Sequence, residues 1–552
     1  MIKPLLLEYK DFKQVTKPSR LYLMPLGGCG TFGMNMTCYI IDRKMIIVDA
    51  GSNFAEPWMV GVSFVIPNPN HWVFQKFDLL AYIITHAHED HIGALPYFLK
   101  KRKSAIYASP WTVETIQRRF FEHNLDCPIT PVEPGGTVTL EPFSVKFLKV
   151  GHSIPDACSL LIRAAGNTIF HSGDFKFDSK DGSPPPSLQS LKDESIDIAL
   201  CDSTNADKDG FCPPEDSVGE AFRNIIKSTN KNVFITSFSS NLFRFTLIGE
   251  ICKSLGKTLY VSGRSIRNNF ILARRMNLIQ DTYFSDDAEA SAKTSNSVIL
   301  ISGCQGEYRS ALARLANDEH RFFRIKKGDL VLFSSRAIPG NEKNIVEIIN
   351  KLKRLKAKVL TGKDAPGIHV SGHAFGGEIE TLAKHLKANY FIPIHGGFGH
   401  LLANQERHKG QKTLLIENGD LIEYDSKLAK INGTLKFDHA YIDELSSIPL
   451  AKSEVLEKIQ IAKKGVATLS GVVSPEQRQW IRGPSLQFIG LPQDDAFLAK
   501  LTKGLTNALR EEKKGNRADP DFLIKKLKAL WESEVEIFVG KRPVFKAEIW
   551  LI

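Results

Sequence analysis

The sequence predicts an α/β protein with two or three domains, and three observations carry this prediction. The chain has 552 residues, more than one hydrophobic core usually organises. From about Arg20 to Asp202, short apolar runs follow one another closely, which is typical of β-rich structure with few helices. From about Ser203 to Val370, apolar runs alternate with helical stretches, which is the rhythm of a parallel sheet wrapped by helices.

The predicted strands of the first region end in residues that can bind a metal. These strands are Leu21–Leu26, Thr37–Ile41, Met45–Val48, Leu80–Ile84, Val145–Val150, Cys158–Ile162, Thr168–Phe170 and Ile196–Leu200. Asp49, His152, Asp174 and Asp202 each follow the end of one of these runs. Groups at one end of successive strands meet once the strands form a sheet, so we expect these side chains to lie close together.

Three imidazoles and a carboxylate lie within six consecutive positions, as His86, His88, Asp90 and His91. A buried-strand pattern precedes them and helical spacing follows at Ile92–Lys101, which places them in a strand-to-helix turn. From such a turn His86 and His88 converge while Asp90 and His91 face the other way, so one peptide could hold two metal ions. These ligands suit zinc, with manganese as the alternative. A coincidental surface cluster is disfavoured by the spacing and by the apolar strand before it.

The second region is predicted to be an α/β domain. Its strands are Val233–Ile235, Thr258–Val261, Val298–Ile301, Leu330–Phe333 and Val359–Leu360, and its helices are Val218–Lys227, Phe243–Leu255, Asn269–Leu278, Ser310–Ala316 and Glu342–Leu355. Small polar residues follow three of the strands, at 237–241, 303–307 and 334–336. Such residues can hold phosphates with hydroxyls and backbone amides, although ordinary loops explain each of them equally well.

Histidines and serine reappear after this region, as His369, Ser371, His373 and His395. If His395 completes the metal centre, the second domain must be an insertion after which the first domain resumes near Ser371. We therefore expect a first domain at residues 1–204 and 371–450, an inserted domain at 205–370, a linker at 451–464 and a C-terminal domain at 465–552.

The C-terminal domain is predicted to be a small α+β unit. Its strands are Val466–Val473, Leu486–Leu491 and Phe545–Ile552, and its helices are Asp494–Glu512 and Asp521–Trp531. The lysine-rich run Lys525–Lys528 could touch RNA, although a solvated helix face is the simpler explanation.

Composition narrows the class of protein. Hydrophobic residues make up 43% and charged residues 24% of the chain, as in ordinary globular proteins. No apolar stretch approaches about 20 residues and the first residues do not form a signal peptide, so we expect a cytoplasmic protein. The eight cysteines are scattered singly, which suggests neither a disulfide framework nor a thiolate zinc site. The net charge of +11 favours an anionic partner.

Together these residues suit a dinuclear hydrolase, in which two metal ions hold a hydroxide and clamp the attacking and leaving oxygens. We assign His86, His88 and His152 to one ion, and Asp90, His91 and His395 to the other, with Asp174 bridging the two. Asp49 is expected to orient the ligands or water without binding a metal ion itself. His373, together with Asp202, is expected to protonate the departing oxygen.

Further motifs extend the pattern over nearly the whole chain. They are LGGCGTFGMNM at Leu26–Met36, IVDAG at Ile47–Gly51, THAHEDHIGALPYFL at Thr85–Leu99, GHSIPDA at Gly151–Ala157, HSGDFKFD at His171–Asp178, CDSTNA at Cys201–Ala206, TSFSSN at Thr236–Asn241, GCQGEYRSALARLA at Gly303–Ala316, SSRAIPGNE at Ser334–Glu342, HVSGHA at His369–Ala374 and PIHGGF at Pro393–Phe398. The arrangement resembles the metallo-β-lactamase fold, its β-CASP branch of nucleases, and within that branch the ribonuclease J family. The residues beyond Lys464 match this family only loosely.

The resemblance implies a metallo-β-lactamase αβ/βα sandwich with an inserted β-CASP α/β domain. It implies a cytoplasmic ribonuclease with two Zn2+ ions per chain that acts in rRNA processing and mRNA decay. Such an enzyme degrades single-stranded RNA from a 5′-monophosphate end and also cuts internally. It further implies that His369, Ser371, Ser237 and Ser239 grip the RNA phosphates. A homodimer or homotetramer formed through the C-terminal domain, with partners in RNA-degradation complexes, is the implied assembly.

Departures and alternatives qualify these expectations. Where the family usually reads GGLGEIGKN, this chain has Thr31, Phe32 and Met34, which puts RNA contacts of that loop in question but leaves the metal ligands intact.

The competing hypotheses are a β-CASP enzyme that only cuts internally or acts on DNA, a small-molecule hydrolase such as a thioesterase or lactonase, and a non-catalytic RNA-binding scaffold. The inserted domain and the basic charge disfavour the small-molecule hydrolase, and the intact ligands disfavour the scaffold.

Overall fold

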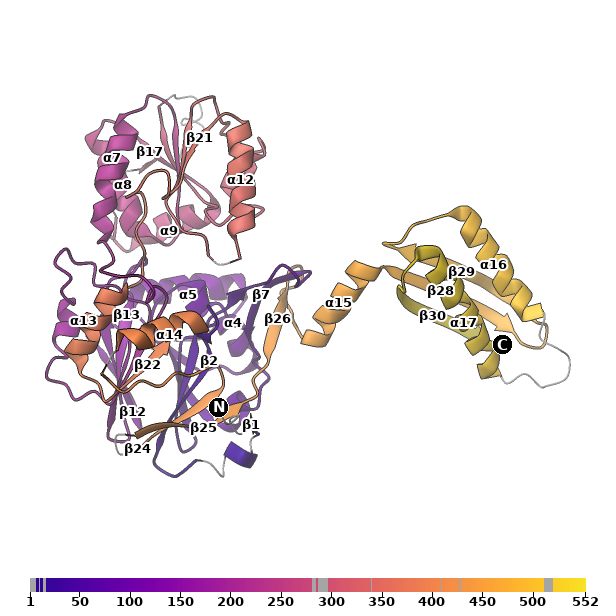
Figure 1. Ribbon diagram of the computed structural model, residues 1–552, viewed down its shortest axis with the longest axis horizontal. Helices are drawn as coiled ribbons and strands as arrows, with labels where there is room; N and C mark the ends of the chain where they lie inside the picture. The colour runs from indigo at the N-terminus through magenta and orange to yellow at the C-terminus, as the bar shows by residue number, and fades with distance from the viewer. Residues whose placement is uncertain are drawn as a thin grey trace. The chain divides into compact units, whose positions relative to one another are not determined.

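In the computed structural model the chain forms two compact units, one of residues Met1–Phe54 and Val65–His439 and the other of residues Ala55–Phe64 and Ala440–Ile552 (Figure 1). The structure describes residues 6–510 and 520–552, except residues 9, 13–15, 280–283, 286–295, 339, 409, 426 and 427. Over these residues, every helix is too short or too polar to span a lipid bilayer.

Two sheets form the body of the first unit. The larger has nine strands, in the order β1 (Leu6–Leu7), β25 (Leu428–Leu435), β24 (Asp420–Asp425), β2 (Leu21–Gly27), β4 (Met36–Ile41), β5 (Lys44–Val48), β8 (Asp78–Ile84), β9 (Ala105–Ala108) and β10 (Ile129–Pro131). The other has six strands, in the order β11 (Thr137–Leu140), β12 (Phe143–Lys149), β13 (Cys158–Ala164), β14 (Asn167–His171), β15 (Ile198–Asp202) and β22 (Tyr390–Ile394).

A single apolar core joins the two sheets. Leu23, Ile46 and Ile83 from the larger sheet and Leu160 and Ile392 from the smaller one belong to it, and none is more than 1% exposed. Helices cover the outer faces, because α5 (Pro110–Glu122) contacts β9 and β10, and α14 (Phe398–Arg407) contacts β22. The remaining helices of this part are α2 (Val73–Lys76), α3 (Glu89–Ile92), α4 (Leu95–Lys101), α6 (Pro186–Gln189) and α13 (Gly376–Leu386). The result is a helix–sheet–sheet–helix sandwich.

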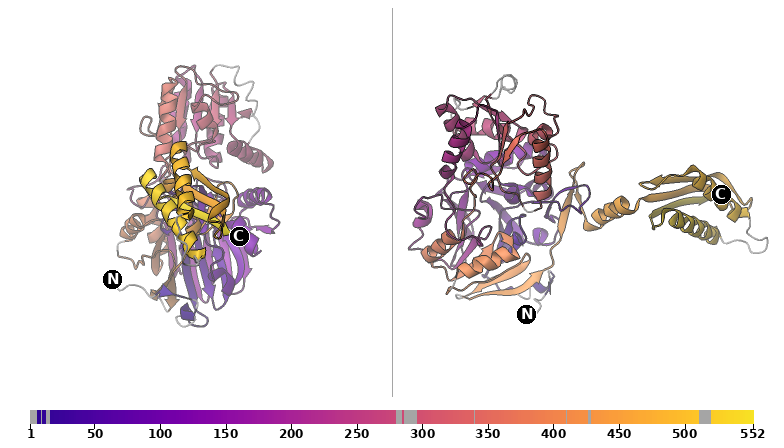
Figure 2. Two further views of the ribbon diagram at one scale, coloured as in Figure 1. Left: turned by 90° about the vertical axis from the view of Figure 1, so that its right-hand side faces the viewer. Right: turned by 45° about the horizontal axis from the view of Figure 1, so that its top comes forward.

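The inserted domain has a parallel sheet of its own. Its strands are ordered β18 (Phe284–Ser285), β17 (Leu259–Ser262), β19 (Val298–Ile301), β16 (Val233–Thr236), β20 (Leu330–Phe333) and β21 (Lys358–Leu360). Helices α7 (Gly219–Lys227) and α8 (Leu242–Ser254) lie on one side of this sheet and α12 (Glu342–Arg354) on the other, and α9 (Arg264–Arg275) and α11 (Ala311–Ala316) complete the domain (Figures 1 and 2). This matches the α/β architecture that the alternating pattern predicted.

The chain leaves the six-stranded sheet after β15 and re-enters it at β22. These two strands are parallel neighbours, with Asp202 beside Ile394. The insertion is therefore a long crossover between adjacent strands, and it brings Asp202 and His395 to the same edge of the sheet. Short β3 (Cys29–Gly30) and β23 (Gly396–Gly397), which are also parallel, hold the segment after β22 against the first loop of the chain.

The second unit contains the predicted α+β tail. Strands β29 (Gln479–Ile489), β28 (Val466–Ser474) and β30 (Val544–Leu551) form its sheet, which packs with α16 (Asp495–Arg510) and α17 (Pro520–Val539) around Leu469, Leu505 and Trp531. Two residues of the predicted helix Asp494–Glu512, at 511 and 512, lie outside the described residues. Strands β26 (His439–Asp443) and β27 (Pro449–Leu450) pair before α15 (Lys452–Lys464) begins.

Two details differ from the expected domain division. The segment expected to be a linker, residues 451–464, forms the helix α15, and the side chain of Glu454 accepts a hydrogen bond from the backbone N–H of the N-cap residue Ala451 at 2.6 Å. Residues 440–450, which we assigned to the first domain, lie in the second unit. The finer division of the first unit at residues 204 and 370 stays a proposal.

Trp531 allows the core of the second unit to be tested. Its side chain is fully buried and its ring packs edge-on against Phe545, with 4.9 Å between ring centroids. We expect Trp531→Ala to cost roughly 3–5 kcal/mol of the unfolding free energy of this unit, because it leaves a large cavity. Limited proteolysis should then cut residues 465–552 faster. Trp550→Ala, at a 55% exposed position, is the matched control and should leave the cleavage rate unchanged. Equal sensitivity of the two variants would contradict this core assignment.

Candidate metal centre

The predicted metal ligands all lie where strands of the two sheets end. His86 and His88 follow β8, Asp90 and His91 lie in α3, and His152 follows β12. Asp174 follows β14, and His395 follows β22. All but His88 and Asp90 are buried. The sandwich therefore gathers side chains from four separate segments at one edge.

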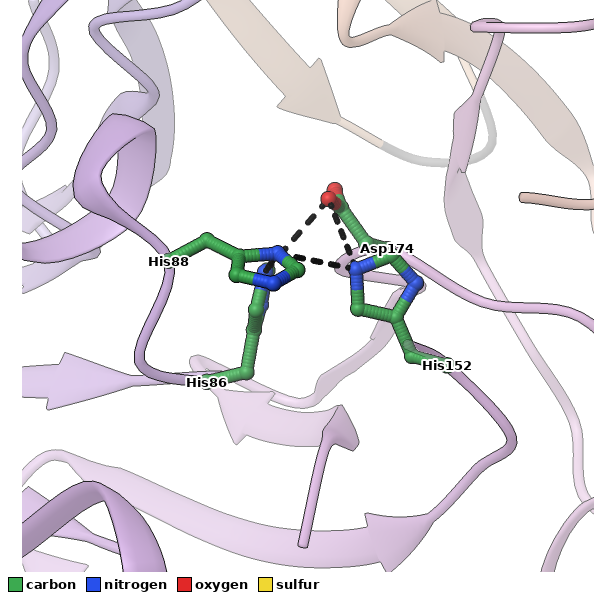
Figure 3. Close-up of side chains that lie close together, drawn as sticks. All are labelled: His86, His88, His152 and Asp174. Carbon is green, nitrogen blue, oxygen red and sulfur yellow. Dashed lines mark hydrogen bonds and ion pairs between the residues drawn. The ribbon is translucent and has the colours of Figure 1, made fainter. Parts of the chain in front are cut away.

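His86, His88, His152 and Asp174 form the first ligand group, and Figure 3 shows their rings and carboxylate turned toward a common point. Nδ1 of His88 lies 3.1 Å from Nε2 of His86 and 3.1 Å from Nε2 of His152. Oδ2 of Asp174 lies 3.4 Å from Nε2 of His86 and 3.5 Å from Nε2 of His152. Tetrahedral ligand atoms about 2 Å from a zinc ion are about 3.3 Å apart, so the spacing fits such an ion.

The second group consists of Asp90, His91, Asp174 and His395. Oδ1 of Asp174 lies 3.3 Å from Nε2 of His91 and 3.3 Å from Nε2 of His395. Oδ2 of Asp90 lies 3.6 Å and 3.3 Å from the same two nitrogens. The two groups share Asp174 through different oxygens, which is the arrangement of a bridging carboxylate.

Asp174 itself supplies a test of whether these residues fit a metal. Its Oδ1 is buried and accepts no hydrogen bond among the described residues, although two imidazole nitrogens lie 3.3 Å away. Nε2 of His91 and Nε2 of His395 therefore do not donate a hydrogen bond to Oδ1 of Asp174. A buried carboxylate oxygen without a donor is costly, and a cation between these atoms would satisfy oxygen and nitrogens together.

Each of the five histidines also has its other ring nitrogen occupied. Nδ1 of His91 contacts Oδ2 of Asp49 at 2.7 Å, Nδ1 of His152 donates to the carbonyl oxygen of Gly372 at 2.7 Å, and Nδ1 of His395 contacts Oγ1 of Thr204 at 2.7 Å. Nδ1 of His86 contacts the hydroxyl of Thr85 at 3.1 Å, and Nε2 of His88 contacts that of Ser240 at 3.0 Å. Such contacts fix the tautomer and leave the inward nitrogen free to bind a metal.

The electrostatics divide the histidines into two sets. Burial lowers the pKa of His86 and of His152 well below the ordinary value, and lowers that of His88 to about 4, so these rings are neutral. For His91 and His395, burial also opposes protonation, but Asp174 and other carboxylates outweigh it and raise the pKa. Carboxylates therefore concentrate negative charge on the second group, where positive charge is stabilised.

Asp49 contacts one of the expected ligands, His91, through Oδ2. Besides His91, its carboxylate accepts hydrogen bonds from the backbone N–H and the hydroxyl of Thr85, each at 2.8 Å. It is 2% exposed and contacts no other ligand ring directly. Three contacts hold the carboxylate in place and let it fix the ring of His91.

His373 and Asp202 lie together beside the metal groups. Nδ1 of His373 is 2.8 Å from Oδ2 of Asp202, and its Nε2 is 3.9 Å from Oδ2 of Asp174. Burial opposes protonation of His373, but Asp202 and Asp174 raise its pKa above the ordinary value. With 19% of its side chain exposed, His373 can reach a bound substrate.

The residues expected to hold phosphate lie in different environments. His369 and Ser371 are half-buried in the segment that leads to His373. Ser237 is buried, and its hydroxyl donates to the carbonyl oxygen of Ser334 at 3.0 Å. The carbonyl oxygen of Ser239 accepts a hydrogen bond from Nδ2 of Asn269 at 2.7 Å.

Sequence reasoning missed several residues that contact the ligands. Nδ2 of Asn35 lies 3.1 Å from Nε2 of His91 and 3.3 Å from Oδ2 of Asp90. Thr204 and Ser240 contact His395 and His88. Asn35 belongs to the glycine-rich motif, so its place there was a usable signal. Thr204 and Ser240 lie in the CDSTNA and TSFSSN motifs and gave the same kind of signal, although the motifs do not identify their partners.

The altered loop contains no charged side chain at its three unusual positions. The hydroxyl of Thr31 accepts from Asn418 at 3.0 Å, and Met34 is buried. The ring of Phe32 packs edge-on against His400, with 4.7 Å between ring centroids. At the two positions where the usual family motif has charged residues, this chain therefore has a hydrogen-bonded threonine and a buried methionine.

An arginine-lined groove of about 640 Å³ begins beside the metal centre at Glu89. It runs between α5 and the N-terminal ends of α9 and α11, and its arginines are Arg118, Arg119, Arg264, Arg309 and Arg314. Three carboxylates also line it, of which Glu89 pairs with Arg119. The excess of arginine suits a phosphate backbone.

Three family models match parts of this chain. Residues 44–225 match a family model described as a β-lactamase superfamily domain. Residues 230–352 match one described as the β-CASP domain of ribonuclease J, and residues 367–414 match one described as a Zn-dependent metallo-hydrolase RNA specificity domain.

Whole-chain relatives agree with these matches. Ribonuclease J of Helicobacter pylori is 32% identical, over 87% of this chain and 72% of that protein. Ribonuclease J of Sinorhizobium meliloti is 31% identical, over 97% of this chain and 98% of that protein. A crystal structure of a protein of unknown function from Enterococcus faecalis is 12% identical, covers 73% of this chain and 100% of that one with a TM-score of 0.53, and shows the fold alone.

Removal of the shared carboxylate tests the two-group arrangement. We expect elemental analysis of the wild-type protein to approach about two metal ions per chain. Asp174→Asn should reduce this to less than about one, because both groups lose a ligand. Asp193→Asn, at an exposed position, should leave the metal content unchanged. Full occupancy in Asp174→Asn would contradict the bridging position.

Asp49 can be tested separately from the ligands. Asp49→Asn preserves the shape of the side chain but removes the charge that fixes His91, so we expect metal affinity to fall by about 10–100-fold. Competition with a chelator of known affinity measures this change. An affinity equal to that of wild type would show that Asp49 serves only the loop containing Thr85.

Proposed function

The chain belongs to the ribonuclease J family, as its motifs predicted, and from this membership and its metal centre we propose that it is a metal-dependent ribonuclease. It degrades and processes single-stranded RNA in the 5′-to-3′ direction, prefers a 5′-monophosphate end and also cuts internally. The observation that carries this proposal is the pair of four-residue ligand groups that share Asp174.

Two Zn2+ ions per chain are the proposed cofactors, with Mn2+ as the alternative. His86, His88 and His152 hold one, Asp90, His91 and His395 hold the other, and Asp174 holds both. When bound, such ions acidify water and stabilise negative charge on phosphate oxygens. Five imidazoles and two carboxylates provide only nitrogen and oxygen donors, which both of these metals accept.

His373 is the proposed proton donor. Asp202 accepts the hydrogen bond from Nδ1 and stabilises the protonated ring, so that Nε2–H is available on the side of Asp174. Thr204 donates to the other oxygen of Asp202 at 2.7 Å, which fixes this carboxylate. We assign to His373 the protonation of the oxygen that leaves when the phosphodiester bond breaks.

RNA is the proposed substrate because an arginine-lined groove begins beside the metal centre at Glu89. The arginine-lined groove suits the backbone of a single strand. His369 and Ser371 are proposed to grip the 5′ phosphate, with Ser237 and Ser239 supporting the same region. The C-terminal domain is proposed to form homodimers or homotetramers. It is also proposed to bind partner proteins of RNA-degradation complexes.

The direct test is incubation of metal-loaded protein with 3′-labelled single-stranded RNA that carries a 5′-monophosphate or a 5′-triphosphate. Matched DNA and a thioester are included. We expect release of mononucleotides from the monophosphorylated RNA, and a loss of at least about 100-fold in Asp174→Ala and His395→Ala. Asp193→Ala is the control on the surface and should retain full activity.

The other outcomes decide between the alternatives. Internal fragments without mononucleotides would indicate an enzyme that only cuts internally, and equal cleavage of DNA would indicate a nuclease without sugar specificity. Hydrolysis of the thioester alone would indicate a small-molecule hydrolase. Activity that survives both ligand substitutions would overturn the proposal.

A further inference from the structure

Arg244 is a buried cation that joins three separate segments of the first unit. Its side chain is 0% exposed, and its Nε donates to Oε1 of Glu215 at 2.7 Å. Its Nη1 donates to the carbonyl oxygen of Ser334 at 2.8 Å and lies 3.0 Å from Nδ1 of His369. Its Nη2 donates to the carbonyl oxygen of Val370 at 3.2 Å. The guanidinium of Arg244 therefore attaches the segment that leaves the inserted domain, at His369 and Val370, to the inserted domain itself.

The contact with Arg244 determines which nitrogen of His369 carries the proton. A guanidinium has donors only, so Nδ1 of His369 must accept the hydrogen bond and cannot be protonated. The backbone of Ser334 also lies near the ring, but its carbonyl oxygen already accepts from Arg244 and from the hydroxyl of Ser237. The contact of Nδ1 with Arg244 therefore places the proton of the neutral ring on Nε2.

Electrostatics keep this ring neutral. Burial, Arg244 and Arg336 lower the pKa of His369 to about 3, and Lys176 contributes in the same direction. These three cations belong to three different segments. The ring of His369 therefore lies in positive surroundings, and an anionic oxygen is the acceptor that suits an N–H donor of this ring.

The segment that follows His369 leads directly into the metal centre. The carbonyl oxygen of Gly372 accepts from His152 at 2.7 Å. The hydroxyl of Ser371 accepts from Nδ2 of Asn205 at 2.8 Å and from the backbone N–H of His373 at 3.2 Å. Arg244 therefore holds one end of this segment at Val370, and His152 holds the other end at Gly372.

We infer that Arg244 is a positioning residue, which holds His369 as a neutral Nε2–H donor to a phosphate oxygen of the substrate. The inference rests on the proposed function, and it adds Arg244 as a residue that affects substrate binding through His369. A neutral donor recognises the phosphate by direction and not by charge, so the contact persists across the range of about pH 5 to 8 in which free histidine changes its charge.

The first measurement is NMR of the full chain labelled with 15N-histidine, with the His369 signals assigned by their absence in His369→Gln. We expect one protonated and one unprotonated ring nitrogen, with the proton on Nε2, from about pH 5 to 8. A proton on Nδ1, or a doubly protonated ring in this range, would overturn the inference. This measurement requires no nuclease activity, so it separates failure of the inference from failure of the proposed function.

The second measurement uses Arg244→Met, which leaves Glu215 with Lys176, 3.7 Å away, as its remaining counter-ion. We expect KM for 5′-monophosphorylated RNA to rise about tenfold, the effect of one hydrogen bond to a charged group. For 5′-hydroxyl RNA, kcat and KM should change by less than about twofold, and the His369 signals should show loss of the single tautomer.

Asn241→Ala is the matched control for loosening of this network. The side chain of Asn241 caps α8 by accepting from the backbone N–H of Arg244 at 3.1 Å and donates to Glu215, but it leaves the guanidinium on His369. We expect the single tautomer and the preference for monophosphorylated RNA to persist in this variant. Equal losses on both RNAs in Arg244→Met would show a merely structural role. If Arg244→Met does not fold, the wild-type NMR measurement still decides the tautomer.

Discussion

The Asp174 carboxylate is the constraint on which the centre of this protein depends. A carboxylate that is 2% exposed must be compensated by positive charge or hydrogen bonds, and here four imidazoles surround it within 3.5 Å. Burial raises the pKa of Asp174, but the histidines outweigh burial and hold it well below the ordinary value. The Asp174 carboxylate and the imidazole rings therefore stabilise one another inside the protein. This requires the strand ends that carry them to lie close together.

Sheet topology satisfies this requirement. Because β15 and β22 are adjacent and parallel, the position after one strand lies beside the position after the other, however long the chain between them. An entire α/β domain can thus be inserted without separating Asp202 from His395. The return segment is then held by Arg244 from the inserted domain and by His152 from the sandwich, so the insertion is attached at the site and not only at its chain ends.

The sequence predicted what depends on local order. The spacing from His86 to His91, the apolar runs that end at Asp49, His152 and Asp174, and the change of rhythm near Ser203 all express local structure, and the structure contains a sandwich and an inserted sheet at these places. Contacts between distant residues left no such signal. Arg244 follows an ordinary helix start, and nothing near it in the sequence indicates Glu215, Ser334 and His369 as partners. The sequence suggests a linker where the structure has the helix α15, because residues Ser446–Lys464 are rich in lysine and serine.

The hydrogen bond from His152 to Gly372 has a thermodynamic consequence. One partner is a metal ligand, and the other belongs to the segment through which the inserted domain returns. Any change in the position of that segment therefore changes the free energy of metal binding. By linkage, an ion at His152 favours one position of the segment by the same amount. Metal occupancy of the centre and the position of the segment that contains Gly372 are thus coupled in one equilibrium.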